Sequence, residues 1–196
     1  QGHEVKVVTG FPFYPDWKKR KEDEGVFFRK DYAKGVEIYR GYLYVPENPT
    51  TFSRIVQEIT FLVFAFINFF RAGKPDVIVA FTTPVSLGFL CAIFKRLYGC
   101  KLVINVQDFQ VEAASSLEMS SGALLKAIEK VEAHSYKKAD YVSSISYSML
   151  DILRIDKKLP EHKVLFWPNW IDVPEASRIP EKGKFRQKFE VATDKK

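Results

Sequence analysis

The sequence predicts an α/β protein built on a Rossmann-like parallel sheet flanked by helices. Short apolar segments alternate along the chain with segments whose apolar residues recur every three or four positions, which is the pattern of repeated βα units. The 196 residues, 46 % of them hydrophobic and 28 % charged, suffice for one globular domain. Two cysteines are too few for a disulfide framework, so a small disulfide-stabilised fold is excluded.

The N-terminal half contains three predicted strands and one long helix. Val5–Thr9 is a short apolar strand, and Val36–Tyr44 alternates in polarity as a strand near a sheet edge does. Thr51–Arg71 has helical periodicity, and Val77–Phe81 is an apolar run typical of a central strand. Gly2 stands directly before the first strand, as a residue that ends a helix would. We therefore expect a sheet that lacks its first strand and first helix.

The C-terminal half continues the alternation. Pro84 favours a helix that begins at Thr83 and extends through Leu97, because proline fits the first helical turn. The remaining strands are predicted at Leu102–Val106, Tyr141–Ile145 and Val164–Trp167, and the remaining helices at Gly122–Lys138 and Tyr147–Ile155. Cys91 and Cys100 fall on a helix and beside a strand, where they are expected to be small buried side chains.

Charge and motifs exclude several classes of function. The net charge of +6 is dispersed, and the basic run Lys18–Lys21 is followed at once by Glu22, Asp23 and Glu24, so a nucleic-acid interface is not expected. No spacing of Cys and His residues indicates a zinc site. The glycine-rich and nucleophile motifs of dinucleotide-binding proteins, P-loop NTPases and serine hydrolases are also missing from the sequence.

Candidate binding residues lie in the segments that follow the strands, where open α/β sheets bind ligands. Asp108, beside Gln107, could hold a sugar hydroxyl or accept a proton, or it could cap the next segment. Thr82 and Thr83 begin a helix, where they could bind an anion or act as caps. Tyr14 and Trp17 could stack on a sugar or a lipid, or could anchor their loop. Further candidates in these segments are Asp16, Glu112 and Ser146.

The helix at 51–71 is apolar on two faces. One face, predicted to meet the core, contains Phe52, Ile55, Val56, Ile59, Leu62, Val63, Phe66 and Phe70. The other face is also apolar in its second half, and Phe61, Phe64 and Phe69 are its candidate lipid contacts. The apolar run Ile59–Phe70 is shorter than the roughly 20 residues of a membrane span. The alternatives are a helix buried on both faces, a membrane-surface or lipid contact, and a homodimer contact.

Several segments together resemble the N-terminal domain of family 4 glycosyltransferases of the colanic-acid and exopolysaccharide type. These segments are F-P-F-Y-P-D-W, K-P-D-V-I-V-A-F-T-T-P, K-L-V-I-N-V-Q-D-F, A-D-Y-V-S-S-I-S and V-L-F-W-P-N-W-I-D. The resemblance extends from Gly2 to about Asp172. It implies the acceptor-binding half of a GT-B fold at 1–168. Residues 169–196 would then form the interdomain linker and the start of a donor-binding domain that this chain lacks.

The resemblance also implies a chemistry. A retaining transferase of this kind moves a sugar from a nucleotide sugar to a glycan acceptor without a metal or another cofactor. Gln107 and Asp108 match the position where such enzymes present polar groups to the reacting sugar, and Asn169 matches the linker motif. The apolar helix suggests a lipid-linked acceptor and a peripheral location on the cytoplasmic face of the cell membrane. By itself this chain is expected to be inactive. The alternative function is a non-catalytic α/β binding or membrane-association module.

Overall fold

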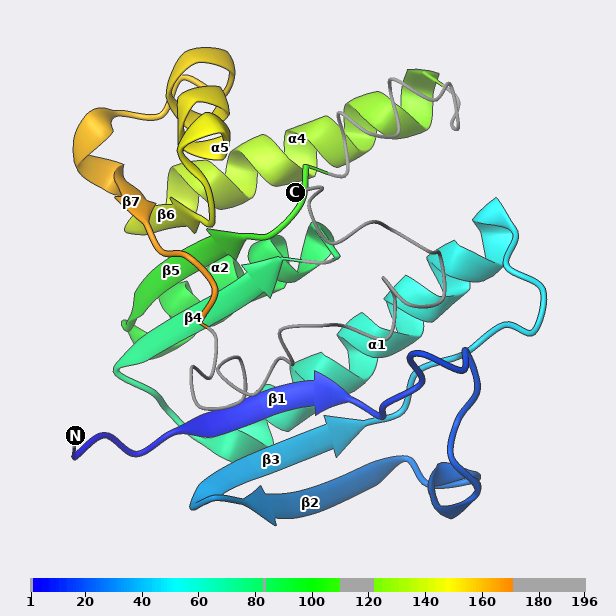
Figure 1. Ribbon diagram of the computed structural model, residues 1–196. Coiled ribbons are helices and arrows are strands. Elements are labelled where there is room, and N and C mark those ends of the chain that lie inside the picture. The colour runs from blue at the N-terminus through cyan, green and yellow to red at the C-terminus, as the bar shows by residue number, and fades with distance from the viewer. Residues whose placement is uncertain (1, 83, 110–121, 171–196) are drawn as a thin grey trace, which may run out of the picture.

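The computed structural model describes residues 2–82, 84–109 and 122–170 (Figure 1). Within these ranges the strands are β1 (Lys6–Gly10), β2 (Phe28–Ala33), β3 (Val36–Gly41), β4 (Val77–Thr82), β5 (Lys101–Val106), β6 (Tyr141–Ser144) and β7 (Val164–Phe166). The helices are α1 (Thr51–Ala72), α2 (Ser86–Tyr98), α4 (Gly122–Lys138) and α5 (Tyr147–Asp151). A π-helical turn, Ile152–Asp156, follows α5, and short 3-10 turns occupy Lys21–Asp23 and Glu161–Lys163. The α/β class and all six predicted strands are confirmed.

The C-terminal half forms a four-stranded parallel sheet in the order β4-β5-β6-β7. Parallel neighbouring strands need a crossover connection between them. Helix α2 lies in the connection from β4 to β5, and α4 lies in the connection from β5 to β6. Ile78, Ala80, Leu102, Ile104 and Val142 are buried and meet the buried side of α2 in one hydrophobic core. This sheet and its helices are the Rossmann-like part of the fold.

The N-terminal half forms a second, three-stranded sheet in the order β1-β3-β2, in which β3 is parallel to β1 and antiparallel to β2. The strand β2 was missed in the sequence because charged residues occupy its centre. Its turn, Lys34-Gly35, has positive φ at both residues, as a two-residue hairpin of type I′ requires. Among the described residues β1 and β4 are not paired, so the strands form two sheets rather than the single sheet that the sequence predicts.

The helices α1, α2 and α4 lie side by side on one side of the two sheets, α2 in the middle (Figure 1). The start of α1 is fixed by Thr50, whose hydroxyl accepts a hydrogen bond from the N–H of Ser53 while the Ser53 hydroxyl accepts one from the N–H of Thr50. Because these helices follow parallel strands, each begins at the edge where the strands end and runs back along the sheet.

The inward face of α1 is the one that the sequence analysis placed away from the core. Ala65 and Asn68 are buried, and Phe64 packs against the rings of Phe27, Phe28 and Tyr42. Phe69 stacks on Phe94 of α2 with ring centroids 4.5 Å apart. The predicted orientation of this helix was therefore wrong. The reason is that both faces are apolar, whereas the small residue Ala65 and the glycine Gly41 beneath the helix allow only one face to approach the sheet closely.

Candidate functional site

The polar ends of β4, β5 and β6 meet at one edge of the four-stranded sheet, as predicted. Register places Thr82 beside Val106 and Val106 beside Ser144, so the residues that follow these strands emerge together. The hydroxyl of Thr82 donates to the carbonyl of Asn105 (3.4 Å), and that of Ser144 donates to the carbonyl of Val106 (2.8 Å). Both hydroxyls are buried and stabilise the ends of the strands.

A line of side-chain hydrogen bonds crosses this edge from β6 to the segment after β7. Asn105, 1 % exposed, donates through Nδ2 to the hydroxyl of Ser143 (2.9 Å) and accepts through Oδ1 from Nε2 of Gln107. The Oε1 of Gln107 in turn accepts from Nδ2 of Asn169 (3.0 Å). Two candidates from distant parts of the sequence, Gln107 and Asn169, are thus joined, and a buried asparagine orients them.

Asn105 and Ser143 are the site residues that the sequence analysis missed. They lie within strands, where the sequence does not distinguish a polar residue that faces the interior from one that faces solvent. Their signal was nevertheless present, because Asn and Ser interrupt otherwise apolar strands one or two residues before the end. Buried polar groups of this kind are retained only when they are hydrogen-bonded, which these are.

Asp108 follows Gln107 directly and is exposed at the same edge. An exposed carboxylate next to a fixed amide can accept hydrogen bonds from the hydroxyl groups of a ligand. The aromatic residues Phe81 and Trp167 lie nearby with ring centroids 6.4 Å apart, and both rings are partly exposed. They were not predicted as site residues, and together they offer an apolar surface beside the polar line.

The loop after β1 presents the predicted aromatic candidates to solvent. Tyr14, Asp16 and Trp17 are exposed, and the Tyr14 and Trp17 rings lie 6.2 Å apart at nearly a right angle. Phe13 also contacts Trp17, at 5.6 Å. Trp17 has a positive φ of 54°, an uncommon conformation for a bulky residue. This loop extends from the other sheet, so these residues belong to a second group distinct from the polar line.

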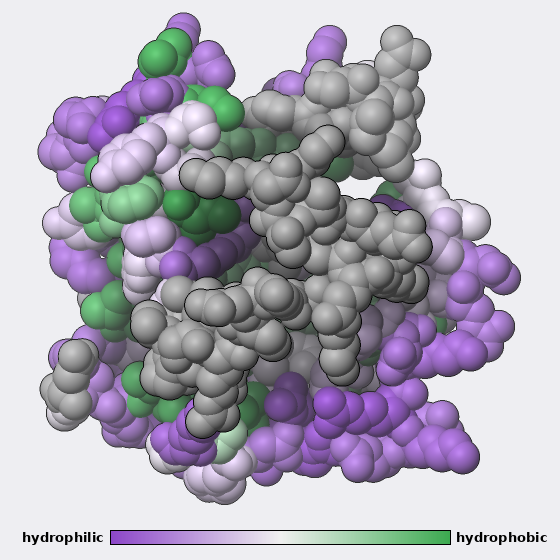
Figure 2. Space-filling model, viewed as in Figure 1, coloured by the Kyte–Doolittle hydropathy of each residue, from purple (hydrophilic) through white to green (hydrophobic). Residues whose placement is uncertain are grey.

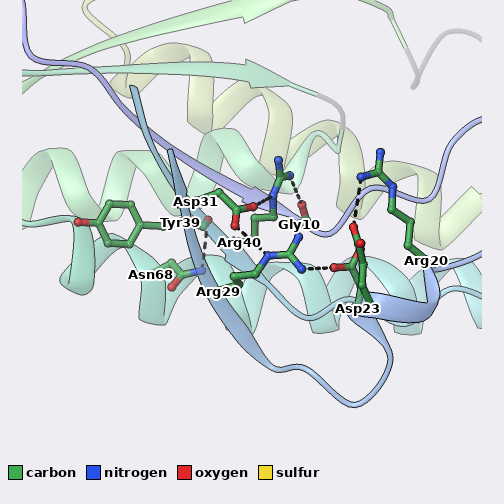
Figure 3. Close-up of polar contacts among 9 residues, drawn as sticks. Gly10, Arg20, Asp23, Arg29, Asp31, Tyr39, Arg40 and Asn68 are labelled. Atoms are coloured by element: carbon green, nitrogen blue, oxygen red, sulfur yellow. Dashed lines mark hydrogen bonds and ion pairs between the residues drawn. The ribbon is translucent and has the colours of Figure 1, made fainter. Parts of the chain in front are cut away.

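An ion-pair network holds the base of that loop (Figure 3). The Arg29 guanidinium donates to Asp23 (2.5 Å) and Asp31 (2.9 Å), and Arg40 donates to Asp31 (2.5 Å) and to the carbonyl of Gly10 (3.4 Å). Burial raises the pKa of Asp31, but the hydrogen bonds from Arg40 and Arg29 outweigh it, so this pKa lies below its ordinary value. Because Asp23 is fully buried, the network ties the loop to the β2–β3 hairpin.

The charged residues of this region are visible on the sheet side of the molecule. Figure 2 shows hydrophilic side chains gathered over the hairpin and the 3-10 turn at Lys21–Asp23, whereas apolar side chains are more frequent over β4 and β7. The two groups of candidates thus differ in character. The loop after β1 combines aromatic rings with a charged surround, and the edge of the four-stranded sheet combines amides with an apolar surround.

The remaining predicted site residues lie in different parts of the fold. Ser146 caps α5, since its hydroxyl accepts from the N–H of Met149 (3.4 Å). Phe61, Phe64 and Phe69 are partly buried and face the protein, so the prediction that they contact lipid was wrong. Thr83 and Glu112 lie outside the described residues.

Nothing in the described part of the chain forms a metal site, since no three His, Cys, Asp or Glu side chains cluster there. Cys91 and Cys100 are buried free thiols, as expected. Burial raises the pKa of Cys91 to about 12, so that this thiol remains protonated at neutral pH and is a poor nucleophile.

Comparison with known proteins identifies relatives. Residues 1–170 match the model of the glycosyl transferase 4-like domain family. The chain is also 28 % identical over 185 residues to the assigned colanic acid biosynthesis glycosyl transferase WcaI of Escherichia coli (strain K12). That alignment covers 91 % of this chain and 45 % of WcaI, so the chain spans about half the length of this relative.

Proposed function

Because the chain belongs to the glycosyl transferase 4-like family, we propose that it is the acceptor-binding part of a retaining glycosyltransferase. The enzyme moves a sugar from a nucleotide sugar to a lipid-linked glycan in the biosynthesis of a cell-surface polysaccharide. The similarity to WcaI, which is assigned to colanic acid biosynthesis, supports this polysaccharide class. The observation that carries the proposal is the line of amides at the ends of the parallel strands, where α/β sheets bind their ligands.

The proposal gives each residue of the polar line, and of the aromatic pairs near it, a role toward the acceptor. Gln107 and Asp108 contact the acceptor sugar, with the Asp108 carboxylate accepting hydrogen bonds from its hydroxyl groups. Asn105 is a positioning residue, because its Oδ1 holds the amide of Gln107 in one orientation. Phe81 and Trp167 provide an apolar surface for the face of the sugar ring. Tyr14 and Trp17, on the loop after β1, contact a more distant part of the acceptor.

The proposal also includes the nucleotide-sugar donor and the cellular location of the protein. The nucleotide sugar is bound mainly by a donor-binding domain outside this chain, and the reaction needs neither a metal nor another cofactor. The protein acts at the cytoplasmic face of the cell membrane, where a lipid-linked acceptor is presented. The exposed apolar helix α1 supports this location.

The test uses the complete enzyme that contains this chain. We expect Asp108→Asn and Gln107→Ala to lower the rate of sugar transfer by about a hundredfold, because each removes a contact at the reacting sugar. The measurement is the transfer of radiolabelled sugar from each of a panel of nucleotide sugars to the lipid-linked acceptor, which is extracted from membranes. Asp156→Asn, which neutralises an exposed carboxylate on the π-helical turn, is the matched control and leaves the rate unchanged.

The alternative, a non-catalytic binding or membrane-association module, predicts a different result. It is favoured by the same exposed helix, which needs no catalytic edge to bind a partner. Under this alternative no nucleotide sugar supports transfer by the complete protein, although the protein still binds membranes. Unchanged turnover in both Asp108→Asn and Gln107→Ala would refute the roles assigned to these residues.

A further inference from the structure

The outer face of α1 is apolar along its whole length. Seven side chains that fall within one third of the helical circumference are exposed, namely Phe52, Ile55, Ile59, Val63, Phe66, Ile67 and Phe70. Phe52 is 76 % exposed, and Ile59 and Val63 in the middle are about half exposed. These are largely the residues that the sequence analysis assigned to the core. An apolar stripe of about five helical turns on the surface of a protein indicates that this surface contacts a membrane or another molecule.

The neighbouring helix α2 extends this surface. Phe89, Ile93 and Leu97 recur every four residues and are exposed. The two helices are in contact, since Phe66 and Phe70 of α1 pack against Phe94 of α2 with ring centroids 5.4 and 5.1 Å apart. The outer sides of α1 and α2 therefore form one continuous apolar surface.

The third helix of the layer, α4, is basic where the other two are apolar. Lys126, Lys130, Lys137 and Lys138 are exposed on its outer side, whereas one of its two carboxylates, Glu132, is buried. His134 of α4 contacts the ring of Phe89, which places the basic side next to the apolar one. At their C-terminal ends α2 and α4 also border a hollow of about 440 Å³ that is lined by Lys95, Lys101, Lys137, Lys138, His162 and Lys163 around Asp140.

Further cations border the apolar stripe on its other side. Arg71 lies over the ring of Phe28 at 4.8 Å, and Lys19 lies over that of Tyr42 at 3.6 Å. Both rings pack against Phe64 of α1. The apolar surface is therefore flanked by positive charge on two sides.

We propose that the outer face of the α1–α2–α4 layer is a surface for peripheral binding to an anionic lipid bilayer. The apolar side chains of α1 and α2 enter the boundary between headgroups and acyl chains, and the lysines of α4 contact the lipid phosphates. This inference rests on the proposed function, since a lipid-linked acceptor is presented by such a bilayer. It replaces Phe61, Phe64 and Phe69 as the lipid contacts.

The helix α1 lies in the plane of the membrane and does not cross it. It is the one helix in the described part of the chain that is long and apolar enough to span a bilayer. Its inner face, however, is packed against the protein. Asn68 is fully buried, donates to the carbonyl of Tyr39 (3.4 Å) and accepts from Arg71 (2.8 Å). Crossing the bilayer would expose this amide to hydrocarbon and break those contacts.

The charge pattern favours a bilayer over a second copy of the chain. In a symmetric dimer through this face, the lysines of α4 and the cations beside α1 would face the positively charged groups of the other copy and repel them. Anionic headgroups neutralise them instead. Moreover, α1 begins at the edge where the strands end, so Phe52, its most exposed large apolar residue, lies toward the candidate site. A bilayer that contacts α1 would thus lie beside the site that receives the acceptor.

The test is binding of this chain to vesicles without nucleotide sugar or acceptor. Vesicles of phosphatidylglycerol and phosphatidylethanolamine are compared with vesicles of phosphatidylcholine in a sedimentation assay. We expect binding to the anionic vesicles that weakens with salt, and a loss of roughly tenfold or more in partitioning for Ile59→Gln with Val63→Gln. Ile155→Gln, at an exposed apolar position on the π-helical turn, is the matched control and binds as the parent does.

A second pair of variants tests the electrostatic part. Lys130→Gln with Lys137→Gln should lower binding to anionic vesicles and reduce its dependence on salt, whereas Lys21→Gln with Lys158→Gln, on other faces, should not. Because all changes are at exposed positions, circular dichroism should show unchanged folding.

Three outcomes would overturn the inference. The first is a parent chain that does not bind anionic vesicles, and the second is unaltered binding by the Ile59→Gln and Val63→Gln variant. The third is a dimer in sedimentation velocity that this variant dissociates, in the absence of vesicle binding. Any of them leaves the transfer reaction in place, whereas a complete protein that binds vesicles but transfers no sugar contradicts the proposed function alone.

Discussion

Gly41 shows how a single residue sets the distance between α1 and the first sheet. A side-chain Cβ at this position would lie 2.7 Å from the Cβ of Phe64 and 3.1 Å from Nδ2 of Asn68. Both neighbours are held on the inner side of the helix, where Phe64 packs among three aromatic rings. The helix can therefore approach β3 only because this residue has no side chain.

We expect Gly41→Ala to lower the free energy of unfolding by about 2 kcal/mol, because the added methyl group forces α1 away from β3. Urea denaturation followed by circular dichroism measures the change. Gly122→Ala is the control, since a Cβ at that position has no atom within 4 Å. A loss of stability in Gly122→Ala as large as that in Gly41→Ala would argue against close packing as the cause.

At the scale of elements, Asp140 joins the connection between α4 and β6 to α2 and to β5. Its carboxylate lies between α4 and β6, pairs with Lys95 of α2 (2.7 Å) and Lys101 of β5 (3.3 Å), and accepts from the N–H of Leu102 (2.8 Å). Burial raises the pKa of Asp140, but the hydrogen bonds from Lys95, Leu102 and Lys101 outweigh it and lower the pKa to about 2. The ionised carboxylate is thus preferred in the folded protein.

The lowered pKa makes this link sensitive to pH. The stabilisation is complete above the pKa of about 4 that an aspartate has in the unfolded chain, and it is lost as the pH falls from there toward 2. We expect Asp140→Asn to lower the free energy of unfolding at pH 7 by about 1 kcal/mol, with allowance for solvent screening. Urea denaturation at pH 7, 4 and 2.5 should show the difference from the parent shrinking with acidity. A difference of the same size at pH 7 and pH 2.5 would show that the charge of Asp140 does not cause it.

At the scale of the whole molecule, the two sheets share one helix layer, and in the described part of the chain no strand of one sheet pairs with a strand of the other. The helix α1 packs on β1 and β3 of the first sheet and on α2, which covers the second sheet. Within the described residues, β1 is paired on one side with β3, and β4 is paired on one side with β5. Since a strand in a parallel sheet directs alternate N–H groups to opposite sides, half of the amides of β1 and β4 have no strand partner among the described residues.

Native-state hydrogen exchange tests this arrangement. We expect slow and fast amides to alternate along β1 and β4, whereas the amides of β5, which is paired on both sides, exchange slowly throughout. Exchange measured residue by residue by NMR resolves the pattern. Uniformly slow exchange along β4 would mean that a further segment pairs with this edge.

The sequence alone determined the class of fold and most of the elements. The helix at Gly122–Lys138 has the predicted bounds, and α1 and β4 each differ from prediction by one residue. Local periodicity, helix caps and turn residues are properties of neighbouring positions, so they can be recognised without a structure. The same reasoning predicted that Thr82, Gln107 and Ser146 would lie at one edge of the sheet, because parallel strands end together.

Only the tertiary structure decided which face of α1 is buried, how the strands divide into sheets, and which polar residues meet. The two faces of α1 are about equally apolar, so its orientation depends on a fit against Gly41 that no local pattern contains. The bond between Gln107 and Asn169 joins positions 62 residues apart. Such contacts arise from the packing of whole elements, and this packing also exposes the apolar stripe that we propose contacts the membrane.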